Sequence, residues 1–288
     1  MTMTRRTAIS TAAAALLPTA RLWAAKQKLA GLKLGVTDWN LDLTGKLEAV
    51  ALSKSLGFDG VQVSIGRKLQ DGKLPLADPQ LQEQYLAEAK KNNIALAGTC
   101  LDILHDNYLK NDPLGKKWIA EAIPITKKLR AQIMLLPFFG KGALKTAEEM
   151  DYVADVLKEL APEAQKAGVV LALENTISAE DNVRILDRVK SRALSVYYDV
   201  GNSTSNGFDV VKEIRWLGKE RICQVHLKDK GYLGEGKIDF PAVLRALSDI
   251  GYAGYAVFET SAPSGSRDND MRKNLAYIQK VIGEGRQS

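Results

Sequence analysis

Short apolar runs alternate with amphipathic stretches along the chain from residue 32 onward. Each unit begins with an apolar run, passes a polar or glycine-containing corner, and continues into a stretch whose apolar positions recur at helical spacing. The spacing is clearest in residues 146–167, where Met150, Val153, Leu157 and Leu160 fall on one face. The unit repeats about every thirty residues, which is the size of a βα unit.

This repeat predicts eight strands that alternate with eight helices. The expected strands are residues 32–39, 58–65, 94–101, 133–139, 169–174, 194–200, 222–228 and 255–260. The expected helices are residues 44–56, 78–92, 113–129, 146–167, 178–190, 207–217, 240–250 and 268–282.

The strands are nearly continuous apolar runs, which is typical of parallel strands that are covered on both faces. The sequence therefore predicts the α/β class and a single (β/α)8 TIM barrel over residues 25–288. An open doubly wound sheet is the alternative, but no G-x-G-x-x-G motif follows the first expected strand.

Residues 1–24 have the pattern of a twin-arginine export signal. Arg5 and Arg6 precede a short apolar stretch, and Ala24 offers a small residue at the cleavage point. The stretch is too short to remain as a membrane anchor. We therefore expect cleavage and a periplasmic or secreted bacterial protein with no stable membrane anchor. The alternative is an N-terminal helix of a cytosolic protein.

The composition is that of an ordinary globular protein, with 45% hydrophobic and 26% charged residues among 288. The net charge of +6 lies partly in the arginines of the first 24 residues, and no Lys/Arg run forms a stripe along which a phosphate backbone would bind. Nucleic acid is therefore not an expected partner. Cys100 and Cys223 fall on strands at opposite sides of the expected barrel, so we expect free thiols rather than a disulfide.

Polar residues close almost every expected strand, and the active sites of TIM barrels lie at these C-terminal strand ends. The first half of the chain supplies mostly amide, hydroxyl and ring groups with two acids, whereas the second half supplies three acids, a histidine, two amides and a lysine. The residues concerned are Asp38, Trp39, Asn40, Gln62, Ser64, Asp102, His105, Pro137, Glu174, Asn175, Asp199, Asn202, His226, Lys228 and Glu259.

Strands five to eight each end in a potential metal ligand: Glu174, Asp199, His226 and Glu259. Taken singly, each acid fits a helix cap or a solvated loop, and the histidine fits a buried core position. Consecutive members lie about one βα unit apart, so their side chains should meet on one side of the barrel rim. Three crowded acids repel one another unless a cation lies among them. The sequence predicts one divalent metal, and the oxygen-rich set favours Mn²⁺, with Mg²⁺, Co²⁺ or Zn²⁺ as alternatives.

Five segments of the chain resemble the xylose-isomerase-like sugar phosphate isomerase/epimerase family. They are GFDGVQ at 57–62, LALEN at 171–175, YDVGN at 198–202, VHLKD at 225–229 and GEGKIDF at 234–240. The resemblance extends from about residue 32 to the C-terminus, and the order and spacing of the motifs carry it. It implies a xylose isomerase-like barrel and a metalloenzyme similar to ketose 3-epimerases or aldose–ketose isomerases.

The resemblance also implies roles for the four expected ligands. Glu174 and Glu259 would be the catalytic residues, because in the family the corresponding glutamates bind the metal and also move the proton. Asp199 and His226 would mainly hold the metal. The proton would leave a carbon next to a carbonyl, giving an enediolate that the metal stabilises.

The expected substrate-binding residues are Asn202, Lys228, His105, Gln62 and Trp39. Asn202 stands where ketose epimerases often have histidine, and Gln62 replaces an acid that is common in relatives. Lys228 is expected to stabilise the enediolate oxygen and Trp39 to stack on a sugar face. Lys228 also fits a solvated surface lysine, and Trp39 also fits an aromatic residue that only packs. For His105, the loop position is the only feature that suggests substrate contact.

These departures leave three hypotheses for the function. The first is a metal-dependent sugar isomerase or epimerase, the second a lyase or hydratase acting on oxidised (3-keto) glycosides, and the third a non-catalytic periplasmic sugar-binding protein. An endonuclease of this fold would need a histidine-rich metal cluster, and the chain has two histidines. The expected partner is a small sugar or glycoside, and the sequence leaves the oligomeric state open, a homo-oligomer included.

Overall fold

A closed parallel barrel forms the centre of the structure, a computed structural model that describes residues 31–284. Within this range eight strands pair in chain order, and β1 pairs with β8 to close the barrel. The strands are β1 (Lys33–Thr37), β2 (Gly60–Ser64), β3 (Ala95–Cys100), β4 (Ile133–Pro137), β5 (Val170–Glu174), β6 (Leu194–Asp199), β7 (Ile222–Leu227) and β8 (Tyr255–Phe258). The predicted (β/α)8 barrel is confirmed. The predicted export signal, residues 1–24, lies outside the described residues.

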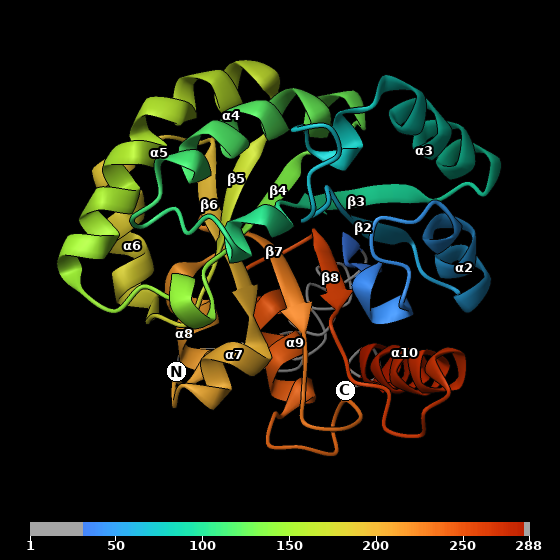
Figure 1. Cartoon of the computed structure of the whole chain (residues 1–288). Coiled ribbons are helices and arrows are strands. Elements are labelled where there is room, and N and C mark those ends of the chain that lie inside the picture. The colour runs from blue at the N-terminus through green and yellow to red at the C-terminus, as the bar shows by residue number, and fades with distance from the viewer. Residues whose placement is uncertain (1–30, 285–288) are drawn as a thin grey trace, which may run out of the picture.

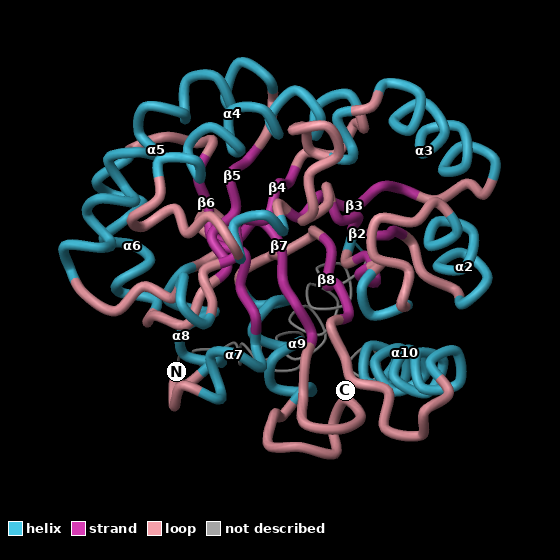
Figure 2. The backbone as a smooth tube through the Cα atoms, viewed as in Figure 1, coloured by secondary structure: helices cyan, strands magenta, loops and turns pink. Residues whose placement is uncertain are grey.

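Helices surround these strands on the outside, as Figures 1 and 2 show. The α-helices are α2 (Glu48–Leu56), α3 (Pro79–Lys91), α4 (Pro113–Lys128), α5 (Ala147–Ala167), α6 (Ala179–Val189), α7 (Val200–Ser205), α8 (Val210–Leu217), α9 (Phe240–Asp249) and α10 (Arg267–Glu284). Short 3-10 helices are η2 (Trp39–Leu41), η3 (Pro75–Ala77), η4 (Asp102–His105) and η5 (Gly140–Gly142). No helix within residues 31–284 has both the length and the apolar composition needed to cross a membrane.

Polar side chains fix where several of the helices begin. Asp78, Asp112 and Asp239 each accept a hydrogen bond from a backbone N–H in the first turn of α3, α4 and α9. Helix α5 begins with a capping box between Thr146 and Glu149. These contacts satisfy donors that a helix start leaves without partners. The observed starts therefore lie close to the starts that the sequence predicts.

The segment after β6 differs from the prediction. The sequence analysis extends the strand to residue 200 and starts the next helix at 207, but α7 begins directly after Asp199. The Asp199 side chain caps this helix, because Oδ1 accepts a hydrogen bond from the backbone N–H of Asn202 at 2.7 Å. Gly207, with φ of 85°, then turns the chain towards α8. A helix of six residues is too short to show a helical period in the sequence.

The apolar core lies mainly between the barrel and its helices. A smaller cluster of Cys100, Leu135, Ala172 and Tyr197 is separate from it. Two of its members, Cys100 and Leu135, also line a cavity at the C-terminal ends of the strands. This end of the barrel is its mouth. Cys100 and Cys223 are free thiols, as expected, and burial raises the pKa of both.

Candidate metal centre

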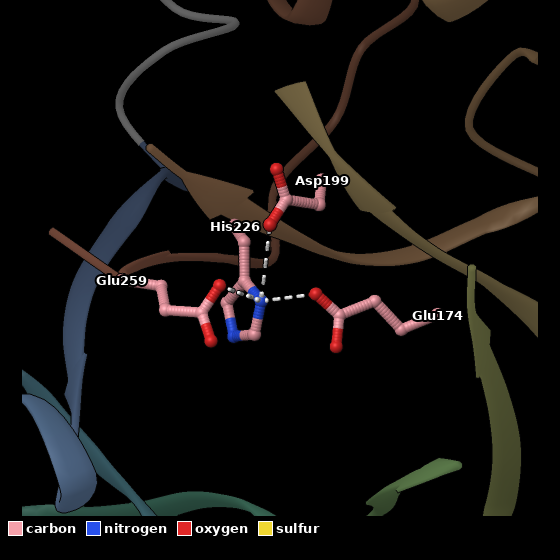
Figure 3. A group of neighbouring side chains, drawn as sticks. All are labelled: Glu174, Asp199, His226 and Glu259. Carbon is pink, nitrogen blue, oxygen red and sulfur yellow. Dashed lines mark hydrogen bonds and ion pairs between the residues drawn. The ribbon is translucent and has the colours of Figure 1, made fainter. Parts of the chain in front are cut away.

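Four side chains from β5 to β8 converge at the barrel mouth. Glu174 and Asp199 end β5 and β6, His226 lies one residue before the end of β7, and Glu259 follows β8. Each offers one potential ligand atom, and these four atoms lie within 4.8 Å of one another. Figure 3 shows the three carboxylates pointing towards one ring nitrogen of the histidine. The structure thus brings together the four residues that the sequence selected.

His226 Nδ1 is the atom on which these carboxylates converge. It lies 2.8 Å from Oε1 of Glu174, 3.8 Å from Oδ2 of Asp199 and 3.7 Å from Oε2 of Glu259. The ring is fully buried, and this burial lowers the pKa of His226, which favours the neutral imidazole. Neutral imidazole is the form that binds a metal ion.

Gln62 holds the other ring nitrogen of His226 from the barrel interior. Nε2 lies 3.0 Å from Oε1 of Gln62, and the same oxygen accepts a hydrogen bond from the Tyr197 hydroxyl at 2.8 Å. An amide oxygen in this position keeps the proton on Nε2 and the lone pair on Nδ1, facing the carboxylates. The sequence analysis expected Gln62 to contact substrate. The structure buries Gln62 completely, does not place it among the residues that line the cavity, and gives it this contact with His226.

The three acids are crowded and shielded from solvent. Burial, followed by repulsion from the neighbouring carboxylates, raises the pKa of Glu174 and of Asp199 well above their usual values. Burial acts on Glu259 in the same direction, but the ammonium group of Lys228 and the hydrogen bonds from Lys228 and Trp39 outweigh it and lower the pKa of Glu259. A divalent cation among these groups would remove the conflict between burial and charge.

Asp199 uses one oxygen for the fold and leaves the other without a hydrogen bond. Oδ1 caps α7, whereas Oδ2 is buried and has no hydrogen-bond partner within residues 31–284. A buried carboxylate oxygen that accepts no hydrogen bond is costly unless a cation meets it. With the His226 lone pair and the two glutamates, this oxygen completes a donor set that suits one divalent ion of the Mn²⁺ or Mg²⁺ type. The residues present therefore fit the expected metal.

Lys228 and Trp39 both donate hydrogen bonds to Glu259. Nζ of Lys228 lies 2.7 Å from Oε2, and the indole N–H of Trp39 lies 3.0 Å from Oε1. Lys228 is also 3.8 Å from Oδ2 of Asp199. Burial disfavours its charge, but Glu259 and Asp199 raise the pKa of Lys228 above its usual value. The lysine stem packs on Gly201, where an added Cβ would come within 2.8 Å of it.

A cavity of about 240 Å³ lies beside these residues. It is smaller than the roughly 300–1,000 Å³ typical of pockets for drug-sized ligands, which suits a single sugar ring. His105 stacks on Phe139 at its wall, with ring centroids 6.2 Å apart. Four of the five expected substrate-binding residues line it, all except Gln62. The lining residues are Trp39, Cys100, Asp102, His105, Leu135, Pro137, Phe139, Glu174, Asn202, Lys228 and Glu259.

Asp102 is a cavity residue that the sequence analysis noted at a strand end but did not select. It begins η4, and its Oδ2 lies 2.5 Å from the hydroxyl oxygen of Ser64 at the end of β2. The sequence feature that could have selected Asp102 is a hydroxyl residue and an acid at the ends of two neighbouring strands. A single aspartate before a helical turn is also a common cap, so that signal is weak in the sequence alone.

Comparison with known proteins gives one family match and several similar enzymes. The family model described as xylose isomerase-like TIM barrel matches residues 50–281. The 2-epi-5-epi-valiolone 7-phosphate 2-epimerase of an Actinoplanes species is 27% identical over 203 residues, covering 68% of this chain and 72% of the relative. The D-psicose 3-epimerase of Enterocloster bolteae is 24% identical over 269 residues, covering 81% and 84%. The solved structure of an L-ribulose 3-epimerase has a TM-score of 0.73 at 18% identity, covering 89% of this chain and 96% of that one.

Proposed function

The chain belongs to the xylose isomerase-like TIM barrel family, and on that premise we propose that it is a divalent-metal-dependent sugar epimerase or isomerase. The family resemblance inferred from the strand-end motifs is confirmed, and the similar proteins include sugar epimerases. The observation that carries the proposal is the cluster of Glu174, Asp199, His226 and Glu259, whose ligand atoms lie within 4.8 Å of one another at a cavity suited to one sugar ring.

The four clustered residues would hold one divalent ion, for which Mn²⁺ is the proposed identity and Mg²⁺, Co²⁺ and Zn²⁺ are the alternatives. When bound, the ion supplies positive charge that polarises the substrate carbonyl and makes the neighbouring C–H more acidic. Gln62 prepares His226 for this role, because it keeps the Nδ1 lone pair facing the carboxylates.

Glu174 and Glu259 are the proposed proton-transfer groups, since both line the cavity and come from different strands. One removes the proton from the carbon next to the carbonyl, and the other returns a proton to the opposite face, which inverts that carbon. Lys228 stands beside Glu259 and would donate a hydrogen bond to the substrate oxygen that gains negative charge. Trp39 and the His105–Phe139 stack offer flat surfaces for the apolar side of a sugar.

Solvent deuterium exchange in the Mn²⁺-loaded protein tests this proposal. We expect the wild type to incorporate deuterium into at least one sugar from a panel of free ketoses and 3-keto glycosides. Glu174→Gln and Glu259→Gln should each lower the rate about 100-fold or more, the scale of a missing general acid or base. Glu159→Gln alters an exposed ion pair with Lys116 and is the matched control, with exchange at the wild-type rate.

Metal analysis of the purified protein completes the test, with one divalent ion expected per chain. Exchange that persists in both glutamine variants would contradict the two-glutamate mechanism. Bound metal with no exchange into any sugar of the panel would instead favour the non-catalytic sugar-binding protein.

A lyase or hydratase acting on oxidised glycosides is the second candidate. It would use the same proton abstraction and then expel a group from the adjacent carbon. Asp102 favours this candidate, because it places a third carboxyl at the same cavity, whereas inversion of one carbon needs only two proton-transfer groups.

We also propose that residues 1–24 direct export by the twin-arginine route. The Arg5-Arg6 pair and the apolar stretch that follows it support this assignment. A double variant, Arg5→Lys with Arg6→Lys, should leave the protein in the cytoplasm of a bacterial host. Equal amounts of wild type and variant in the periplasmic fraction would contradict it.

A further inference from the structure

We propose that Asp102 is a further catalytic residue of this site, the acid that protonates the leaving oxygen when an oxidised glycoside is cleaved by elimination. The inference rests on the proposed function, because elimination begins with the same removal of a proton next to a carbonyl. It assigns a substrate class, a glycoside that carries a ketone on its sugar ring, and it gives the cavity a third proton-transfer group.

Asp102 lines the cavity from another part of the barrel mouth than the metal cluster. It comes shortly after β3, whereas the four clustered residues come from β5 to β8. It nevertheless lines the same cavity of about 240 Å³ as Glu174, Glu259 and Lys228. A sugar ring bound in this cavity would therefore have both the proton-abstracting glutamates and the Asp102 carboxyl among its neighbours.

Ser64 holds the Asp102 carboxyl in one orientation. The Ser64 hydroxyl oxygen accepts a hydrogen bond from the backbone N–H of Gly66 at 3.1 Å and lies 2.5 Å from Oδ2 of Asp102. The hydroxyl proton is thus donated to Oδ2, so any proton that Asp102 carries resides on Oδ1. Ser64 is itself fixed, being fully buried and donating its backbone N–H to Asp38 at 2.9 Å. The acid is therefore oriented before a substrate binds.

The surroundings of Asp102 favour its protonated form. Burial raises its pKa, while the hydrogen bond from Ser64 and the nearby His105 act in the opposite direction. Asp38 on the β1 side and Arg67 after β2 are the other charged groups that interact with it. A carboxyl that keeps its proton closer to neutral pH is better suited to donate that proton to a leaving group.

The elimination step balances without an oxidant or a reductant. A glutamate removes the proton from the carbon between the ketone and the glycosidic carbon, and the electron pair forms a carbon–carbon double bond. The bond from the glycosidic carbon to its oxygen breaks, and that oxygen takes the proton from Asp102. The products are an unsaturated ketone and a free alcohol. The protonated glutamate and the Asp102 carboxylate return to their starting states by proton exchange with water.

Two 3-keto glucosides that differ only in the leaving group test the role of Asp102. Methoxide is a poor leaving group and needs a proton, whereas 4-nitrophenolate leaves readily without one. We expect Asp102→Asn to slow methanol release about 100-fold or more and to slow 4-nitrophenol release by a far smaller factor. Asp106→Asn is the matched control, because Asp106 forms an exposed ion pair with Arg67, and both rates should stay at the wild-type values.

Ser64→Ala tests the positioning contact separately. Its hydroxyl stabilises the Asp102 carboxylate, so its loss should raise the pKa of Asp102. The alkaline limb of the pH–rate profile for methanol release should then move to higher pH, which a purely structural role of Ser64 would not produce. Thermal melting of each variant shows whether it is folded under the assay conditions.

Equal slowing of both glucosides in Asp102→Asn would overturn the assignment. A wild-type protein that exchanges deuterium into the 3-keto glucosides and cleaves neither of them would also overturn it, while leaving the proposed epimerase function intact. A wild-type protein that exchanges deuterium into no sugar would overturn the proposed function itself.

Discussion

The two sides of the barrel mouth bury their acids in different ways. Strands β5 to β8 place the carboxylates of Glu174, Asp199 and Glu259 around one imidazole, and one oxygen of Asp199 has no hydrogen bond among the described residues. Strands β1 to β3 instead lead into a chain of hydrogen bonds in which Ser64 links Asp38 to Asp102. The first arrangement gathers three acids around one imidazole and suits a cation, whereas the second holds its acids apart and links them through N–H and O–H donors.

Asp38 shows that an unpaired carboxylate oxygen alone does not make a metal site. Its Oδ2 accepts hydrogen bonds from the backbone N–H groups of Gly45 and Ser64, while its Oδ1 is buried with no partner in the described part of the chain. Burial raises the pKa of Asp38 to about 8, so this acid holds a proton at neutral pH. The β5–β8 side differs from Asp38 because three carboxylates there surround Nδ1 of a neutral imidazole.

Metal removal should lower the stability that depends on the β5–β8 side and leave the β1–β3 side unaffected. Saturating Mn²⁺, at about 1,000 times the dissociation constant, should stabilise the folded protein by about 4 kcal/mol through linkage. Thermal melting of chelator-treated protein, with and without added Mn²⁺, measures this gain. Asp199→Asn should lose the response, and Asp102→Asn should keep it. A full response in Asp199→Asn would mean that the ion binds elsewhere.

The second effect concerns Asp38 and the dependence of stability on pH. Its pKa rises from 3.8 to about 8 on folding, so the folded state binds this proton more tightly than the unfolded chain does. Its contribution to stability is therefore complete below about pH 4 and is lost as the pH rises through about 8, with an upper bound of about 6 kcal/mol. Asp38→Asn mimics the protonated acid and should flatten this dependence, as urea unfolding across that pH range would show. An unchanged slope would contradict the assigned protonation of Asp38.

Gln62→Leu should weaken the metal site without removing a ligand. The variant loses the acceptor for His226 Nε2, so the ring no longer has its proton fixed on that nitrogen. Loss of such a supporting contact typically lowers metal affinity about 10- to 100-fold. Mn²⁺ titration against a competing chelator measures the change. Gln165→Leu, on the exposed face of α5, serves as the control with unchanged affinity.

Trp39→Phe should have the smallest effect of the four. It keeps an aromatic ring at the cavity but removes the N–H that donates to Oε1 of Glu259. A hydrogen bond to a charged group contributes about 1.5–3 kcal/mol. Because Lys228 still holds the other oxygen of Glu259, we expect the low end of this range, a fall of about tenfold in the deuterium-exchange rate. A wild-type rate in this variant would show that Lys228 alone orients Glu259.

The sequence was sufficient to predict the barrel and its four clustered residues, because both depend on local patterns. Each candidate ligand closes or follows an apolar strand, and consecutive parallel strands in a barrel bring their ends to one rim. The contacts of Gln62 instead join it to residues on distant strands of the barrel. Gln62 is 164 residues from His226 and 135 from Tyr197, and no local period shows which side chains meet across the interior. The selection of Asp102 failed for the same reason, since its contact with Ser64 joins two different strand ends.

Lys228 has a consequence for the order in which the protein is assembled. Its ammonium group lies 2.7 Å from Glu259 and 3.8 Å from Asp199, so the folded chain brings an internal positive charge to its own acids. The barrel should therefore be able to close before any ion arrives, which makes metal loading a later and separate event. The ion acquired then depends on which cations the finished barrel meets first, because availability often decides metal identity more than affinity does. If the proposed metal site is used, the compartment in which folding ends would thus decide which cation the protein binds.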